Sequence, residues 1–223
     1  MFDLHTHTYA SDGVLGFAEL ARRCRVAGYR GLVISDHCDH GNLEAALGQL
    51  LKFCATANRD YGDMTILPGC ELTHVPPPLL AELVKEARRL GAAFVLVHGE
   101  TITEPVEPGT NRAAIEAGVD VLAHPGIIAR EDAALAAKRG VRLEISGRKG
   151  HGLANGHVCR LAQETGAFLC YGSDGHVPGD YLDRKNALLV LRGAGLTPAE
   201  ADDLLAANQA LFESKISTRR NRG

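Results

Sequence analysis

The stretch Phe2-Asp3-Leu4-His5-Thr6-His7 ends a short strand-like run in two histidines. The same arrangement recurs along the chain, where apolar runs end in Asp36-His37, Cys70-Glu71, Val97-His98, Ala123-His124 and Gly172-Ser173-Asp174-Gly175-His176. Scattered histidines would not follow one strand after another. A barrel would place them in this way, because the C-terminal ends of its parallel strands meet at one face and can share one metal site.

Short apolar runs alternate with amphipathic stretches over most of the chain. Strands are predicted at 2–7, 31–36, 65–71, 93–98, 120–124, 141–146 and 168–173, and helices at 16–27, 42–60, 77–90, 108–117, 130–139 and 155–166. The run Phe94-Val95-Leu96-Val97 is continuous rather than alternating, as in strands that are buried on both faces. The repeated βα rhythm predicts a parallel sheet.

Two further helices are expected after the last strand, one at about 180–193 and one that begins at Thr197. In Thr197-Pro198-Ala199-Glu200, the threonine is a candidate N-cap and the glutamate completes a capping box. Residues 215–223 form a short basic tail, for which a frayed end is favoured over a binding arm.

The choice of architecture lies between an open sheet and a closed or distorted barrel. An open sheet concentrates its chemistry at one switch point, whereas a barrel draws on the ends of many strands. At least six of the seven predicted strands end in a candidate ligand. The sequence therefore predicts an α/β fold, a distorted TIM-like (β/α)7 barrel, as a single domain over residues 1–214.

Composition narrows the class of protein. The 223 residues are 45% hydrophobic and carry a formal charge of −3, which gives no basic surface of the kind that binds nucleic acid. Six cysteines form no C-x-x-C pair and are expected to be small buried residues. A strand already begins at residue 2, and no apolar run approaches the ~18 residues that span a bilayer. We expect a cytoplasmic protein with no membrane partner.

The strand ends supply nine candidate metal ligands, six histidines and three acids. They are His5, His7, Asp12, His37, Glu71, His98, His124, Asp174 and His176. A single histidine is more often a hydrogen-bonded core residue, and Asp12 precedes a glycine as turn residues do, but nine at strand ends favour a metal centre. Nitrogen and oxygen donors suit Zn, Mn or Fe, and nine exceed the needs of one ion. Two or three divalent ions are predicted.

These motifs resemble the PHP (polymerase and histidinol phosphatase) superfamily over residues 2 to about 180. The resemblance rests on Asp3–Thr8 with Ser11-Asp12-Gly13, Ser35-Asp36-His37, Gly69-Cys70-Glu71, His98, Ala123-His124-Pro125, Glu144-Ile145 and Gly172–His176. It implies one ion held by His5, His7, Glu71 and Asp174. It further implies that Glu71 bridges to a second ion with His98 and His124, and that Asp12, His37 and His176 hold a third. Asp12 occupies a position that varies within the family.

Other residues are candidates for substrate contact or catalysis beside Glu71 and Asp174. Arg148 and Lys149 follow the sixth strand and suit a phosphate group, although a solvated loop is the alternative. His40 is a candidate acid or substrate contact. His74, His151 and Glu100 are weaker candidates, and His157 is expected to be structural. Glu144 is expected to orient a ligand.

The sequence predicts a hydrolase of phosphoric esters, a metal-dependent phosphoesterase that uses a metal-activated hydroxide. A small phosphorylated metabolite is favoured, a phosphomonoester such as histidinol phosphate or a nucleotide. A nucleic-acid strand is disfavoured by the acidic charge and by the lack of a polymerase domain. The alternatives are a phosphodiester or nucleic-acid end hydrolase, a hydrolase of another ester or amide, and a non-catalytic barrel that serves as a binding subunit. The oligomeric state is left open.

Overall fold

The computed structural model describes residues 1–220 and contains a parallel sheet surrounded by helices. The strands are β1 (Phe2–Asp3), β2 (Gly31–Ile34), β3 (His37–Cys38), β4 (Thr65–Leu72), β5 (Phe94–His98), β6 (Val121–Ala123), β7 (Arg142–Ser146) and β8 (Leu169–Gly172). The helices are α1 (Phe17–Val26), α2 (Leu43–Asp60), α3 (Leu80–Leu90), α4 (Thr110–Ala117), α5 (Arg130–Arg139), α6 (Asn155–Thr165), α7 (Arg184–Gly193) and α8 (Pro198–Arg220), with short 3-10 turns η1 (Pro77–Leu79) and η2 (His151–Ala154).

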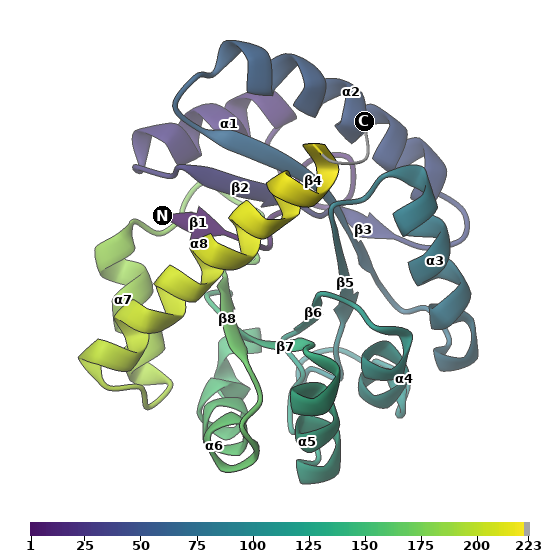
Figure 1. The fold of residues 1–223 in the computed structure, drawn as a ribbon, viewed down its shortest axis with the longest axis vertical. Helices are drawn as coiled ribbons and strands as arrows, with labels where there is room; N and C mark the ends of the chain where they lie inside the picture. Colours follow the sequence, from purple (N-terminus) through teal and green to yellow (C-terminus); the bar gives the residue numbers. More distant parts are fainter. Residues whose placement is uncertain (221–223) are drawn as a thin grey trace.

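The sheet closes on itself. Its strands run in the order β1-β2-β4-β5-β6-β7-β8, all parallel, and the short β3 pairs with β4. Beyond β1 and β8 the chain continues the pairing, since His7 N donates to Gly175 O at 3.0 Å and Asp174 N donates to His5 O at 2.9 Å. Figure 1 shows helices α1 to α7 around the outside of these strands. The predicted TIM-like (β/α)7 barrel in one domain is confirmed.

Two predicted strands differ markedly from what the sequence suggested. The strand at 31–36 divides into β2 and β3 because Ser35 and Asp36 bind the neighbouring chain: Ser35 N donates to Thr6 O at 2.8 Å, and the Asp36 carboxylate accepts from Thr8 N at 2.6 Å. The strand at 2–7 is regular only over β1, since the Asp3 carboxylate turns back to accept from His5 N at 3.2 Å. Both interruptions lie beside the candidate ligands.

Helix α8 crosses the barrel at the end where the strands begin (Figure 1). The buried Phe212 ring lies 5.4 Å from that of Phe2 and 6.4 Å from that of Phe94, both at the starts of strands. Asn208 accepts from Tyr171 N at 3.1 Å and donates to Tyr171 O at 2.7 Å, as a further strand would. The helix therefore closes the N-terminal end of the barrel and leaves chemistry to the opposite end.

The start of α8 agrees with the sequence, but its end differs. Glu200 N donates to Thr197 Oγ1 at 3.3 Å and Thr197 N donates to Glu200 Oε2 at 2.7 Å, so the capping box is confirmed. The helix continues beyond the predicted boundary at 214 through Arg220, because Ile216 packs on the Phe212 cluster and Lys215 pairs with Asp120. Residues 221–223 of the predicted tail lie outside the described residues.

All six cysteines are buried, as predicted. Within residues 1–220, none of the helices combines the length and apolar character needed to cross a membrane.

The closing role of α8 is testable by truncating Phe212. Phe212→Ala is expected to lower the free energy of unfolding by about 3–5 kcal/mol, because it leaves a cavity beneath the strand starts. Gln209→Ala, on the exposed face of the same helix, should change it by no more than about 0.5 kcal/mol. Urea denaturation would measure both, and equal losses for the two variants would show that α8 does not act as a plug.

Candidate metal centre

The nine predicted ligands meet at the C-terminal end of the barrel strands. His5 and His7 follow β1, His37 and Glu71 lie in β3 and β4, and His98 ends β5. His124, Asp174 and His176 follow β6 and β8, and Asp12 comes from the loop before α1. Seven of the nine are buried; His37 is partly exposed and the Asp12 side chain is 55% exposed.

Glu71 lies at the middle of the group. Its Oε2 atom is 3.2 Å from His5 Nε2, 3.5 Å from His7 Nε2 and 2.9 Å from His37 Nδ1. Its other oxygen, Oε1, is 3.3 Å from His124 Nε2. The two oxygens therefore face different histidines, which is the geometry that a carboxylate bridging two ions requires.

Asp174 spans the same space from the other side. Its Oδ1 atom lies 3.3 Å from His7 Nε2, and its Oδ2 atom lies 3.5 Å from His124 Nε2. Residues that follow the first strand and the last strand thus contribute to one cluster.

Asp12 forms a further group with two histidines, since its Oδ1 atom is 2.9 Å from His176 Nε2 and 3.4 Å from His37 Nε2.

Several histidines are oriented through the nitrogen that faces away from the cluster. His5 Nδ1 donates to Glu144 Oε1 at 2.7 Å, His176 Nδ1 to Asp174 O at 2.9 Å, and His98 Nδ1 to Gly99 O at 3.2 Å. Each Nε2 atom is then directed to the cluster, where it offers a lone pair when the ring is neutral. Such an outer hydrogen bond is typical of metal-ligating histidines.

The donor set fits divalent cations. Both oxygens of Glu71 and Oδ2 of Asp174 are buried without a hydrogen bond of acceptable geometry, although imidazole nitrogens surround them. Two ligand atoms ~2.1 Å from one ion stand roughly 3.0–3.4 Å apart, close to the separations found here. Among the described residues, the one Arg or Lys within 4.0 Å of either carboxylate is Arg148, beside Asp174. A cation would stabilise carboxylates buried in this way, and the clustered His and carboxylate groups suggest a divalent metal.

The electrostatics of the site agree with this. Burial and the neighbouring His37 lower the pKa of His7 to about 3, so that its ring is neutral and can donate a lone pair at pH 7. Burial lowers the pKa of His5, but Glu144 and Glu71 outweigh it and raise this pKa well above its usual value. Burial raises the pKa of Glu71, yet His5 and His37 hold it well below its usual range. The carboxylates stay ionised and attract positive charge.

Two of the ligand positions carry backbone strain. The φ angles of His124 and Asp174 are 26° and 49°, in the left-handed region that costs a residue with a side chain of order 1–3 kcal/mol. Such strain persists where the surroundings impose it, and it is concentrated at functional sites. Here the His124 side chain lies near Glu71, and the Asp174 side chain lies near His7 and His124.

Glu144 in β7 holds two ligands at once, as the sequence suggested. Besides binding His5, its carboxylate accepts from His124 N at 3.0 Å. Gly172 makes room for this contact, because a Cβ atom there would stand 2.1 Å from Glu144 Oε1 and 2.7 Å from His5 Cβ.

The remaining candidates from the sequence differ in whether they lie at the ligand cluster. Arg148 Nη1 donates to Asp174 O at 3.2 Å, so this side chain lies at the cluster, whereas Lys149 and His40 are exposed and form no ion pair within residues 1–220. Glu100 has a structural contact, since it accepts from Gly109 N and Asn111 N at the start of α4. His157 binds the backbone oxygen of Ile128 at 2.8 Å.

Sequence reasoning missed one residue and undervalued another. Glu104, in the loop after β5, lies 3.1 Å from His98 Nε2 through its Oε2 atom and 3.4 Å from His151 Nε2 through its Oε1 atom. His151 is buried beside His124. Neither residue ends a strand, so the pattern that located the nine ligands could not locate these two.

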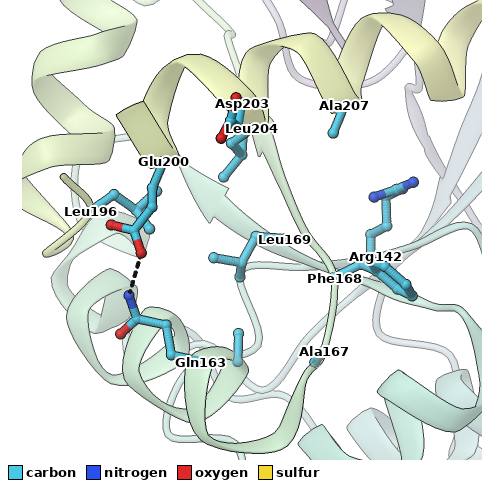
Figure 2. A pocket seen from close by; sticks show the side chains of 11 residues that line it. Arg142, Gln163, Ala167, Phe168, Leu169, Leu196, Glu200, Asp203, Leu204 and Ala207 are labelled. Carbon is cyan, nitrogen blue, oxygen red and sulfur yellow. Dashed lines mark hydrogen bonds between the residues drawn. The ribbon is translucent and has the colours of Figure 1, made fainter. Parts of the chain in front are cut away.

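Two of the hollows on the surface of the barrel bear on the location of the site. A cavity of about 480 Å³ adjoins the metal centre and is lined by Ala10, Ser11, Asp12, His37, Cys38, Asp39, Asn42, Thr73 and His74. The other, in Figure 2, lies between α6, α8 and the starts of β7 and β8, where Gln163 Nε2 donates to Glu200 Oε1. Its lining is largely apolar and it lies at the end opposite the ligands. The first cavity is therefore the candidate substrate site.

Comparison with known proteins identifies relatives of this chain. No family model matches the chain. The chain is 42% identical over 205 residues to an uncharacterized protein of Methanocaldococcus jannaschii, covering 92% of this chain and 94% of that protein. It is 30% identical to a probable phosphatase of Shewanella sp. (strain ANA-3), and the match covers 78% of this chain and 76% of that protein. It is 26% identical to the DNA polymerase/3'-5' exonuclease PolX of Bacillus subtilis over 78% of this chain and 34% of that protein.

These relatives, taken with the nine motif residues in their order, decide the family. The chain belongs to the PHP superfamily. Solved structures share its fold. A chain in the cryo-EM structure of archaeal ribonuclease P with mature tRNA matches this PHP barrel with a TM-score of 0.74 at 16% identity, covering 97% of this chain and 93% of that one. A chain from the crystal structures of YwqE from Bacillus subtilis and CpsB from Streptococcus pneumoniae, described as metal-dependent tyrosine phosphatases, also matches. Its TM-score is 0.58 at 19% identity, and the match covers 96% of this chain and 94% of that one.

The orienting role of Glu144 can be tested without removing a ligand. Glu144→Gln is expected to weaken Mn²⁺ binding by about 10- to 100-fold, because a neutral amide holds His5 less firmly. Isothermal titration calorimetry of the metal-stripped protein would measure this, with Glu131→Gln on the exposed face of α5 as the matched control. Unchanged Mn²⁺ affinity in Glu144→Gln would refute the orienting role.

Proposed function

We propose that this PHP protein is a metal-dependent phosphoesterase that hydrolyses a small phosphorylated metabolite, with a phosphomonoester as the favoured class. The observation that carries the proposal is the position of Glu71, whose two oxygens face separate sets of histidines without hydrogen bonds of their own. The probable phosphatases among its relatives support phosphoester hydrolysis. They give no substrate.

The chain's own residues would hold the metal ions and orient the ligands for such a reaction. His5, His7, Glu71 and Asp174 would hold one divalent ion, Glu71, His98 and His124 a second, and Asp12, His37 and His176 a third. When bound, two or three such ions, Zn, Mn or Fe, supply an activated water and neutralise the charge of a phosphoryl group. Glu144 fixes His5, and the closed barrel keeps the carboxylates away from competing water.

Arg148 is the proposed phosphate contact. Its guanidinium group lies against Asp174, with Nε 4.0 Å from Asp174 Oδ2, and the side chain is 28% exposed. A partly exposed guanidinium beside the ions can bind phosphoryl oxygens bidentately and stabilise the charge that develops there. Lys149 and His40, both exposed, are proposed as weaker contacts at the rim.

The size and lining of the neighbouring cavity favour a small substrate. A volume of about 480 Å³ suits a metabolite, since small-molecule sites commonly measure roughly 300–1,000 Å³. Its lining contains Asp12 and Asp39 but no Lys or Arg among the described residues. A nucleic-acid strand would need basic groups along its path.

A non-catalytic binding barrel is the second candidate. The likeness to a chain in the archaeal ribonuclease P structure concerns the fold, at 16% identity. A binding subunit would not need nine clustered ligands with unpaired buried carboxylates, so the donor set favours the enzyme. Metal content separates the two candidates, because less than one ion per chain after reconstitution would favour the binding subunit.

Metal dependence provides the first activity test. The protein reconstituted with Mn²⁺, Zn²⁺ or Fe²⁺ is expected to hydrolyse members of a panel of phosphomonoesters and diesters, and chelation should abolish the activity. His7→Ala and Glu71→Ala should each reduce kcat on the order of 100-fold or more, comparable to removal of a group that stabilises a developing charge. His157→Ala is the control. Absence of hydrolysis over the whole panel with all three metals would overturn the proposal.

The phosphate contact can be assigned by a pair of neighbouring variants. Arg148→Ala is expected to lower kcat/KM by about 10- to 100-fold, since a hydrogen bond to a charged group contributes about 1.5–3 kcal/mol. Lys149→Ala and His40→Ala should change it by a few-fold at most, because both side chains are exposed. Steady-state kinetics would measure the three. A larger loss in Lys149→Ala than in Arg148→Ala would reverse the assignment.

A further inference from the structure

His151 has the surroundings of a metal ligand although it stands outside the nine motif positions. It begins η2 after β7, and its side chain is only 5% exposed. Its Nδ1 atom lies 2.7 Å from Thr101 Oγ1 and 3.2 Å from Thr103 Oγ1, two hydroxyls that can accept its proton. The Nε2 atom then keeps a lone pair on the side of the cluster, as in His5 and His176.

The His151 ring packs directly against His124. The two imidazole rings are stacked with centroids 4.1 Å apart and an interplanar angle of 17°. One ligand atom from each of His98, His124 and His151 can be chosen so that all three lie within 4.8 Å of one another. Three buried imidazoles at this spacing can share one ion.

Glu104 faces the same three-histidine group from the loop after β5. Its Oε2 atom is 3.1 Å from His98 Nε2, and its Oε1 atom is 3.4 Å from His151 Nε2. The same loop carries Thr101 and Thr103, which orient His151. Glu100 fixes the far end of the loop through its bonds to Gly109 N and Asn111 N at 3.0 and 2.9 Å. The loop therefore supplies the Glu104 carboxylate and also orients the imidazole of His151.

We infer that His151 and Glu104 belong to the ligand set of the ion beside His98 and His124, and that the loop over residues 99–109 completes this ion's site. The inference rests on the proposed function, because it assumes that divalent ions occupy the centre. With Glu71, these groups make three imidazoles and two carboxylates, and a site with three imidazoles favours Zn²⁺, Fe²⁺ or Co²⁺ over Mg²⁺. This ion is thereby distinguished from its neighbours by its ligands.

The experiment measures metal binding rather than hydrolysis. Metal-stripped protein is titrated with Co²⁺, bound metal per chain is determined by plasma mass spectrometry, and the d–d absorption of each site is followed. His151→Ala and Glu104→Gln are each expected to weaken one Co²⁺ site by at least about 10-fold and to leave the others unchanged, since loss of an outer hydrogen bond alone costs 10- to 100-fold. Glu107→Gln, in the same loop, and His157→Ala are the matched controls.

A second variant protects the test against misfolding. His151→Gln retains a polar side chain beside Thr101, so it should fold and still lose the site; circular dichroism checks the fold of every variant. Equal Co²⁺ affinity and stoichiometry in wild type and in the His151 and Glu104 variants would overturn the inference alone. Loss of hydrolysis with all ions retained would also overturn it, because His151 would then act on substrate. A wild-type protein that binds no ion would overturn the proposed function with it.

Discussion

The structure depends on two buried carboxylates, Glu71 and Asp174, that face imidazole nitrogens. Among the described residues, Arg148 beside Asp174 is the one Arg or Lys within 4.0 Å of either. An ionised carboxylate buried without compensation costs several kcal/mol. The barrel concentrates this cost at one point, and histidines from several strands offset it only in part. The left-handed φ angles at Asp174 and His124 show that the backbone bears some of the cost as well. Such an arrangement suggests a site for divalent metal.

The two ends of the barrel differ in what their residues contribute. At the end where strands begin, α8 supplies an apolar side chain and an amide that binds a strand edge, which are contributions to stability. At the end where strands finish, polar groups replace apolar ones at successive strands. This division explains why the apolar hollow beside α8 contains no ligand cluster even though it is well formed (Figure 2).

Most of the fold was predictable from the sequence, because the apolar runs alternate regularly with amphipathic segments and ligands at the ends of strands imply closure. The division of the strand at 31–36 was not, since Ser35 and Asp36 bind groups on a segment distant in sequence. The gathering of the nine candidate ligands at one end of the barrel followed from the position of most of them after strands. Glu104 lies in a loop without periodicity, and its approach to His98 depends on how that loop packs. Local pattern carries no information about such contacts.

Closure of the barrel between residues 5–7 and 174–175 also has a consequence for the order of events during synthesis. The centre joins residues near the start of the chain to residues about 170 positions later, so it cannot assemble until nearly the whole barrel has left the ribosome. Contacts of such long sequence separation form late and slowly. An ion that binds the completed centre and not the unfolded chain would stabilise the folded state by mass action.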